Sequence, residues 1–296
     1  MLPTLRQLRY LTLLAEHRSF RAAAQAAHVS QPALSAGIAE LEKILGAPVV
    51  DRARSGLVLT AVGQAAVERA GDILARTEDL VDAAQAAGRP LTGRFRLGVI
   101  PTIAPFMLPV ALPRLKAAYP QLRLYLREDL TPRLVQGLKT GGLEAALIAL
   151  PYDMAGLEWA HIADDELLAA TPADHPLAAQ SKVTPEALDG EAMILLEDGH
   201  CLREHALAAC GLPDPGPGDD EGFAASSLPT LVEMVGSGLG VSFLPAMAVR
   251  SGLTRNSQVA VRPLAADHPS REIVIAWRKG SSRGAEARLL AEAFRP

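Results

Sequence analysis

Apolar residues recur every three or four positions in three stretches of the first 46 residues. They form the stripes Leu5, Leu8, Leu11 and Leu14; Phe20, Ala23, Ala24 and Ala27; and Leu34, Ile38, Leu41 and Leu45. This spacing predicts three amphipathic helices around one core. Ser30 can cap the third helix, Pro32 is tolerated in its first turn, and Gly46 can end it. Two short helices with a tight connection are typical of a helix-turn-helix, although a plain three-helix bundle gives the same pattern.

A longer helical pattern follows from Val62 to Ala87, without a proline. Its apolar positions repeat every seven residues, at Ala66, Ile73, Leu80 and Ala87, beside Val67, Leu74 and Val81. This repeat predicts one long helix with a seam suited to pairing with a second helix, and the alternative is a helix that packs on its own domain. The stretch "AAGRPLTG" predicts a linker at residues 88–93.

Short apolar strands and helical stretches alternate in the next part of the chain. The order is "RFRLGVI", a helix at 104–119, "LRLYLRE", a helix at 131–140, and "AALIAL". This order predicts a mostly parallel sheet. We expect a second unit of the same kind at about 165–267, after which "EIVIAW" and a helix at 281–294 return to the first unit. In such folds ligands bind at strand ends near helix N-termini, where Thr102 is placed.

Length and charge narrow the class of protein. At 296 residues the chain is long enough for more than one domain. Residues 1–60 contain seven basic and four acidic residues, a net charge of +3, so the other 236 residues carry −7 of the total of −4. A basic N-terminal part on an acidic body favours contact with a polyanion through the first part only. The apolar runs are too short for a membrane span, and the charged N-terminus is unlike a signal peptide, so we expect a cytoplasmic protein without a membrane partner.

The two cysteines of the chain lie in one segment, "LLEDGHCLREHALAAC", at residues 201 and 210. They are either two small buried apolar residues or a reversible redox switch, because permanent disulfides are rare in the cytosol. Cys201 begins a helical pattern and has Arg203 two residues on. Cations and helix N-termini lower the pKa of a thiol, so Cys201 is the expected reactive thiol. His205 is expected on the surface.

Other chemistry finds little support in the sequence. Glu197, Asp198 and His200 beside Cys201 could suggest a hydrolase, but nothing defines an oxyanion hole. The segment "GSGLG" at 236–240 lies between a helix and a strand and is interpreted as a turn. There is no phosphate-binding Walker motif and no His/Cys cluster with zinc spacing. We therefore expect no cofactor and no metal.

The stretch "SFRAAAQAAHVSQPALSAGIAELEKILGAPVVDRARSGLVLTAVG" closely resembles the winged helix-turn-helix of LysR-type transcriptional regulators. The resemblance implies contacts with double-stranded DNA by three residues at the start of the third helix and by two arginines of the wing. These residues are Gln31, Pro32, Ser35, Arg52 and Arg54. Many family members carry a basic residue where this chain has Ala36, so we expect specificity to depend more on DNA shape.

The same resemblance implies an α/β fold class and a division of the whole chain. A winged helix-turn-helix domain takes residues 1–60 and a linker and dimerisation helix takes 61–92. A two-lobed, periplasmic-binding-protein-like (type 2) regulatory domain takes 93–296, with lobe I at 93–164 plus 269–296 and lobe II at 165–268. It further implies an antiparallel pairing of linker helices, a homotetramer, and RNA polymerase as a partner.

"IPT" at 100–102 and the cysteine segment resemble the peroxide-sensing OxyR subgroup of that family. This resemblance implies that hydrogen peroxide oxidises Cys201, that Cys210 resolves the product as a disulfide, and that the switch activates peroxide-defence genes. The implied peroxide pocket is lined by Thr102, Thr131, His200 and Arg271. A LysR-type regulator of a small organic effector with incidental cysteines, and a thiol peroxidase, are the alternatives. We do not expect an enzyme.

Overall fold

The computed structural model describes residues 2–53, 56–85, 90–211, 224–265 and 269–295. Three helices, α1 (Leu5–His17), α2 (Phe20–Ala26) and α3 (Gln31–Leu45), form the N-terminal domain with a hairpin of β1 (Val50–Ala53) and β2 (Gly56–Leu59). The predicted stripes are confirmed as its core, except that Leu5 and Leu45, at the outer ends of their stripes, are exposed. Ser30 caps α3, and Gly46 ends it in the left-handed conformation.

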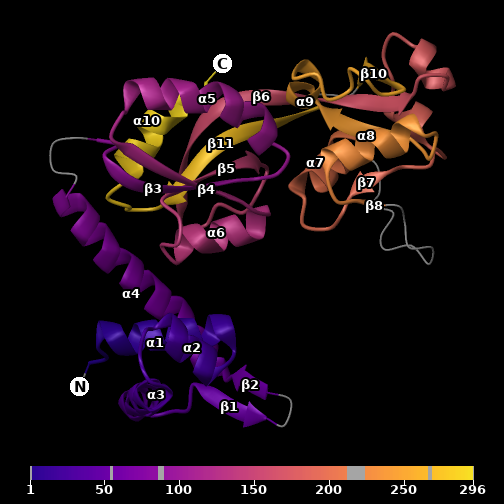
Figure 1. Ribbon diagram of the computed structural model, residues 1–296. Helices are drawn as coiled ribbons and strands as arrows, with labels where there is room; N and C mark the ends of the chain where they lie inside the picture. Colours follow the sequence, from indigo (N-terminus) through magenta and orange to yellow (C-terminus); the bar gives the residue numbers. More distant parts are fainter. Residues whose placement is uncertain (1, 54–55, 86–89, 212–223, 266–268, 296) are drawn as a thin grey trace.

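The long helix α4 (Ala61–Gln85) connects this domain to the rest of the protein (Figure 1). Its first half packs on the N-terminal core, where Ala70 is buried. Three positions of the predicted seam, Ile73, Leu80 and Val81, are exposed instead. Ala87, the last position of the repeat, lies outside the described residues. An apolar face of α4 therefore stays uncovered by the residues that the structure describes.

Lobe I has a buried sheet with helices on it. Parallel strands β4 (Leu122–Glu128), β3 (Gly93–Val99) and β5 (Ala145–Leu150) lie side by side, and β11 (Ser270–Arg278) joins β5 in the antiparallel direction. The helices are α5 (Ala104–Ala118), α6 (Thr131–Lys139) and α10 (Gly284–Phe294). The predicted βαβαβ order and the returning strand are confirmed. The central strands β5 and β11 are apolar and almost wholly buried, whereas the edge strand β4 is mostly exposed.

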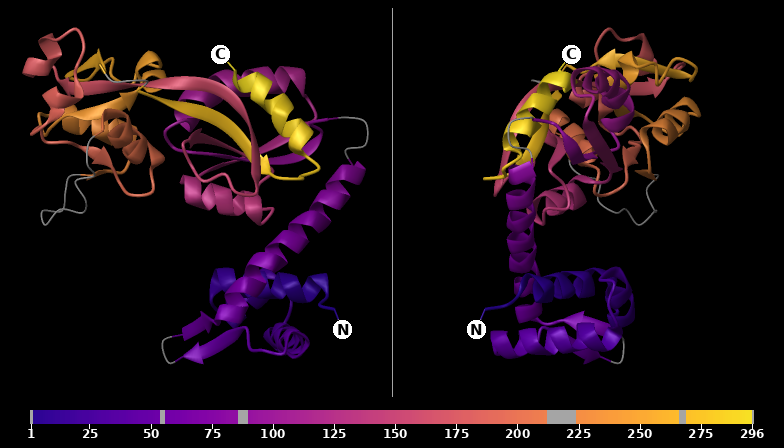
Figure 2. Two further views of the ribbon diagram at one scale, coloured as in Figure 1. Left: turned by 180° about the vertical axis from the view of Figure 1, so that it is seen from behind. Right: turned by 60° about the vertical axis from the view of Figure 1, so that its left-hand side comes forward.

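Lobe II differs from the expected repeat of the first unit. The 16-residue strand β6 (Leu157–Pro172) pairs with β11 and then continues into lobe II, as Figure 2 shows. There β9 (Ser242–Pro245) and β10 (Val259–Pro263) pair with it in the antiparallel direction. The expected parallel sheet in lobe II is therefore wrong. The strand β6 is shared by both lobes, and its two neighbours in lobe II, β9 and β10, are antiparallel to it.

The remaining elements of lobe II are short. A parallel pair is formed by β7 (Leu195–Leu196) and β8 (Ala224–Ala225), and the helices are α7 (Cys201–Cys210), α8 (Leu228–Gly236) and α9 (Ala246–Arg250), with two 3-10 turns at Pro176–Ala179 and Pro185–Leu188. The segment 236–240 ends α8 and turns into the next strand, as expected. Each lobe has its own core cluster. The domain boundaries at 60, 92, 164 and 268 stay a prediction.

Candidate functional site: a buried thiol between two lobes

The start of α3 presents the residues that were predicted to contact DNA. Gln31 and Pro32 are exposed and Ser35 is half-buried, while Leu34 between them is buried in the domain core. Ala36 is exposed beside them. Arg54, like the side chain of Arg52, lies outside the described residues. The exposed end of α3 is thus available to a partner, and the individual DNA contacts stay a prediction.

Cys201 lies where helix α7 of lobe II meets lobe I. Its thiol is free, and the residue is only 7% exposed. Cys201 packs into the core cluster of lobe I, whereas Leu202 and Ala206 of the same helix pack into the core of lobe II. Helix α7 therefore divides its two faces between the two lobes. The side chain of Cys210, which ends α7, lies outside the described residues.

The electrostatics of Cys201 differ from the sequence-based expectation. Burial raises the pKa of the thiol, and the charge of Arg271 and the Thr131 hydroxyl, as a potential donor to the thiolate, oppose that effect in part. The expected lowering of this pKa by Arg203 is wrong. An Arg203 Nη1 lies 3.7 Å from Asp198 Oδ1, and the cation that acts on the thiol comes from the distant strand β11.

Arg271 is fully buried and holds several elements together. Its Nη1 donates to Thr102 Oγ1 at 2.7 Å and its Nη2 to the Thr102 carbonyl at 3.0 Å. Its Nε and Nη2 also donate to Asp165 Oδ2 at 3.1 and 3.0 Å. The other oxygen of Asp165 accepts from the backbone N–H of Met247 at 2.8 Å. Asp165, which the sequence analysis missed, thus neutralises Arg271 where β6 passes from one lobe to the other.

Thr131 brings a free hydroxyl to the thiol. It is the first residue of α6, is almost fully buried, and its Oγ1 has no hydrogen-bond partner among the described residues. The Thr131 hydroxyl also lowers the pKa of Cys201 as a potential donor to the thiolate, which places this hydroxyl near the sulfur. A buried hydroxyl without a partner is costly unless a reacting group uses it.

The two histidines of this segment have different surroundings. His200 is half-buried at the N-terminus of α7 and its side chain makes no capping hydrogen bond. His205 is buried, so its expected place on the surface is wrong. Its Nε2 donates to the carbonyl of Pro151 at 2.9 Å. Burial lowers the pKa of both imidazoles, which are therefore neutral at pH 7.

The structure brings together four of the six predicted residues in one buried network at the boundary between the lobes. Cys201, Thr131, Thr102 and Arg271 are joined by hydrogen bonds or by electrostatic effects on the thiol. His200 is next to them along the chain. No cluster of potential metal ligands occurs among the described residues, and none of their helices is long and apolar enough to cross a membrane.

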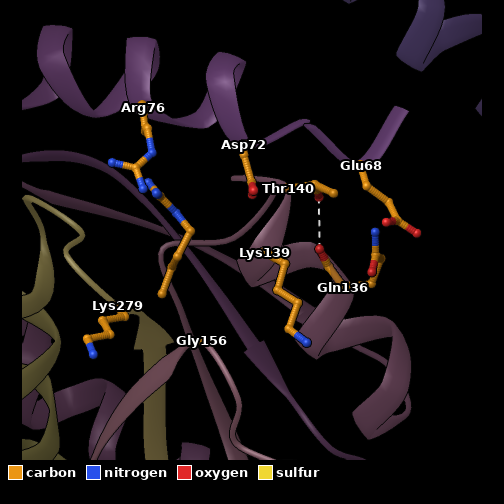
Figure 3. Close-up of a pocket in the computed structure, with 9 residues that line it drawn as sticks. Glu68, Asp72, Arg76, Gln136, Lys139, Thr140, Gly156 and Lys279 are labelled. Carbon is orange, nitrogen blue, oxygen red and sulfur yellow. Dashed lines mark hydrogen bonds between the residues drawn. The ribbon is translucent and has the colours of Figure 1, made fainter. Parts of the chain in front are cut away.

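A separate pocket of about 710 Å³ lies between α4 and lobe I (Figure 3). Its lining is charged and polar and includes Glu68, Asp72 and Arg76 from α4 and Gln136, Lys139 and Thr140 at the end of α6. Thr131 is at the other end of α6. The pocket is therefore not part of the cysteine site.

Comparison with known proteins identifies both halves of the chain. Residues 5–64 match the family model of the bacterial regulatory helix-turn-helix protein, lysR family, and residues 88–296 match the LysR substrate binding domain. The chain belongs to the LysR family. As a LysR-family member it is a transcriptional regulator with a DNA-binding domain.

Similar LysR-family proteins cover almost the whole chain. The DNA-binding transcriptional dual regulator OxyR of Escherichia coli is 37% identical over 98% of this chain and 94% of its own length. A probable hydrogen peroxide-inducible genes activator of Streptomyces viridosporus is 38% identical over 99% and 94%. The regulator EstR of Acinetobacter baylyi is 41% identical over 95% and 92%. The last name does not mention peroxide.

Solved structures of OxyR have the same fold. A full-length cysteine-to-aspartate variant of OxyR from Pseudomonas aeruginosa matches with a TM-score of 0.77 and 37% identity, over 99% of this chain and 98% of that one. A cysteine-to-serine variant of OxyR from Corynebacterium glutamicum, with H2O2 bound, matches with a TM-score of 0.67 and 31% identity, over 100% and 92%.

Proposed function

We propose that this LysR-family regulator senses hydrogen peroxide through Cys201 and activates peroxide-defence genes. The observation that carries the proposal is the buried Cys201 thiol beside the Arg271 charge and the free Thr131 hydroxyl. His200 and Thr102 complete the proposed peroxide pocket. Its relatives named as peroxide-inducible gene activators support the same effector.

The chemistry needs two steps. The thiolate of Cys201 attacks one oxygen of H2O2, the O–O bond breaks, and the leaving hydroxide takes a proton to become water, so that sulfur is oxidised to sulfenic acid. The Cys210 thiol then attacks that sulfur, a disulfide forms, and a second water leaves. Arg271 stabilises the thiolate, and the Thr131 hydroxyl can donate first to the thiolate and then to the peroxide oxygen.

Helix geometry makes the disulfide a conformational switch. In helix α7 the Cα atoms of Cys201 and Cys210, nine residues apart, are roughly 13 Å apart at about 1.5 Å per residue. A disulfide accepts at most about 7 Å between Cα atoms. The disulfide therefore requires α7 to unwind, and its movement changes the packing between the lobes.

The proposal includes an assembly on DNA. The apolar face of α4, where Leu80 is 71% exposed, suits an antiparallel pairing of two copies. We propose a homotetramer in which paired linker helices set the distance between the α3 helices on double-stranded DNA. RNA polymerase would be the partner at the promoter, and the site of action is the bacterial cytoplasm, where that DNA lies.

A second candidate is a LysR-type regulator of a small organic effector. The observation in its favour is the raised pKa of Cys201, because a mostly protonated thiol reacts slowly. DNA footprinting of reduced and peroxide-treated protein decides between the two. A footprint that changes after about one equivalent of H2O2 per subunit supports peroxide sensing. An unchanged footprint excludes it, and continuous consumption of peroxide with a thiol donor would indicate a peroxidase.

A further inference from the structure

His205 connects the helix that carries both cysteines to the other lobe. It lies four residues after Cys201, one helical turn along the same face of α7. Both residues are buried, and both lie within reach of the charge of Arg271, which lowers the pKa of each. By contrast, Leu202 and Ala206 face the core of lobe II. His205 therefore belongs to the face of α7 that meets lobe I.

The hydrogen bond of His205 is directed across the lobe boundary. A carbonyl oxygen only accepts, so Nε2 carries the hydrogen that it donates to Pro151, directly after strand β5 of lobe I. In the neutral ring Nδ1 then has no hydrogen, and it is buried without a partner among the described residues. One hydrogen bond from the middle of α7 thus fixes the imidazole to lobe I.

We propose that His205 is a positioning residue for the redox switch: it holds α7 against lobe I and slows the step in which Cys210 reaches Cys201. The inference rests on the proposed function. Because the disulfide requires α7 to unwind between its two ends, His205 must leave Pro151 before the bond can form. His205 opposes closure of the disulfide and takes no part in the attack on peroxide.

The test separates the two steps in the full-length protein. His205→Leu removes the donor at similar volume, and His205→Gln retains an amide donor at about the right distance. We expect His205→Leu to close the disulfide about five- to tenfold faster, the effect of one lost hydrogen bond, while sulfenic acid forms at the wild-type rate. We expect His205→Gln to restore slow closure. Ala208→Leu, at an exposed position of α7, is the matched control and should leave both rates unchanged.

Three measurements separate the formation of sulfenic acid, the closure of the disulfide and the final equilibrium. A sulfenate trap measures the first step, loss of free thiols measures the second, and a titration against a dithiol measures the equilibrium, which should shift toward the disulfide in His205→Leu by the same factor. Equal closure rates in wild type and His205→Leu, or a His205→Gln variant that behaves like His205→Leu, overturn the proposal. If His205→Leu does not fold, His205→Asn, with a shorter amide side chain, replaces it.

Diamide distinguishes failure of this inference from failure of peroxide sensing. It oxidises a pair of thiols to a disulfide and is itself reduced to a hydrazine, so closure can be timed without peroxide. If wild-type protein does not react with H2O2, the proposed function is refuted. If its disulfide also forms more slowly with diamide than that of His205→Leu, the role of His205 is still supported. If diamide forms the disulfide at equal rates in wild type and His205→Leu, the role of His205 is refuted, regardless of the result with peroxide.

Discussion

Helices α3 and α7 both begin at a proposed functional site, but they are stabilised in different ways. Helix α3 is capped by Ser30 at one end and by Gly46 at the other, and its buried residues all contribute to one core. Helix α7 begins at His200 without a side-chain cap, and its buried residues divide between two cores. A helix fixed by its own domain can present a constant surface to DNA. A helix shared by two lobes can shift or unwind when the lobes move relative to each other.

The largest expected effect is the loss of the peroxide response when the Cys201 thiol is removed. We expect Cys201→Ser to abolish the peroxide response, because a hydroxyl does not attack the O–O bond. Cys210→Ser is the matched control and should still form sulfenic acid without a disulfide. Mass spectrometry with a sulfenate trap measures the modification, and footprinting measures the response. A peroxide-dependent footprint in Cys201→Ser would place the sensor elsewhere.

The next effect is at the ion pair that joins the lobes. Arg271→Leu leaves the fully buried Asp165 carboxylate without its charged partner, so we expect a loss of about 3–5 kcal/mol in the free energy of unfolding. The double variant Arg271→Leu, Asp165→Leu removes both charges and should recover most of that loss. Urea denaturation measures both. Equal stability of the single variant and wild type would contradict a buried network in which Asp165 depends on Arg271 for its charged partner.

The pH dependence of sensing follows from the burial of Cys201. Burial raises the pKa of the thiol above its ordinary value of 9.0, so the thiolate is a minor species at pH 7. Its fraction grows about tenfold per pH unit until the pH reaches the pKa. We expect the rate of sulfenic acid formation to rise about tenfold per pH unit, or about a hundredfold in all, between pH 6.5 and 8.5. A rate that is flat over this range would show a thiol already ionised at neutral pH.

The smallest expected effect is on stability, at the N-termini of α3 and α7. Ser30→Ala removes the cap of α3, where Ser30 Oγ accepts from the N–H of Ala33 at 3.4 Å, and should cost about 0.5–1 kcal/mol. His200→Ala removes no cap from α7 and should change stability by less. Thermal unfolding of the two variants gives the comparison. A larger loss in His200→Ala would mean that the α7 start is held by a contact other than a cap.

Local sequence predicted the N-terminal domain well and the sensing site only in part. The stripes, Ser30 and Gly46 define α3 because their interactions lie within one or two helical turns. Arg203 did not predict the pKa of Cys201, because the cation that lowers this pKa is Arg271. Arg271 is close to the thiol in space but 70 residues away along the chain. Asp165 and His205 have partners 106 and 54 residues away, which no local pattern reveals.

The shared strand was missed for a related reason. A strand pattern shows its length and its buried face, but not that its two halves belong to different cores. In β6 the residues Leu157 and Ile162 pack in lobe I, whereas Leu167 and Ala169 pack in lobe II. The order of the other elements in lobe I could be predicted because β3, β4, β5 and β11 each contribute to one core only.

Helix α6 lies between the Cys201 thiol and the linker helix α4 and contacts both. Thr131 at one end lies beside Cys201, and the turn after the other end rests on α4, where a Cβ on Gly141 would lie 2.4 Å from the Cβ of Ala75 (Figure 3 shows the neighbouring Thr140). Larger side chains at this contact could adjust to a small movement, but here the backbone of the turn after α6 lies almost against the backbone of α4. We therefore expect a displacement of α6 to displace α4 as well, because close-packed groups cannot absorb it by a small local rearrangement.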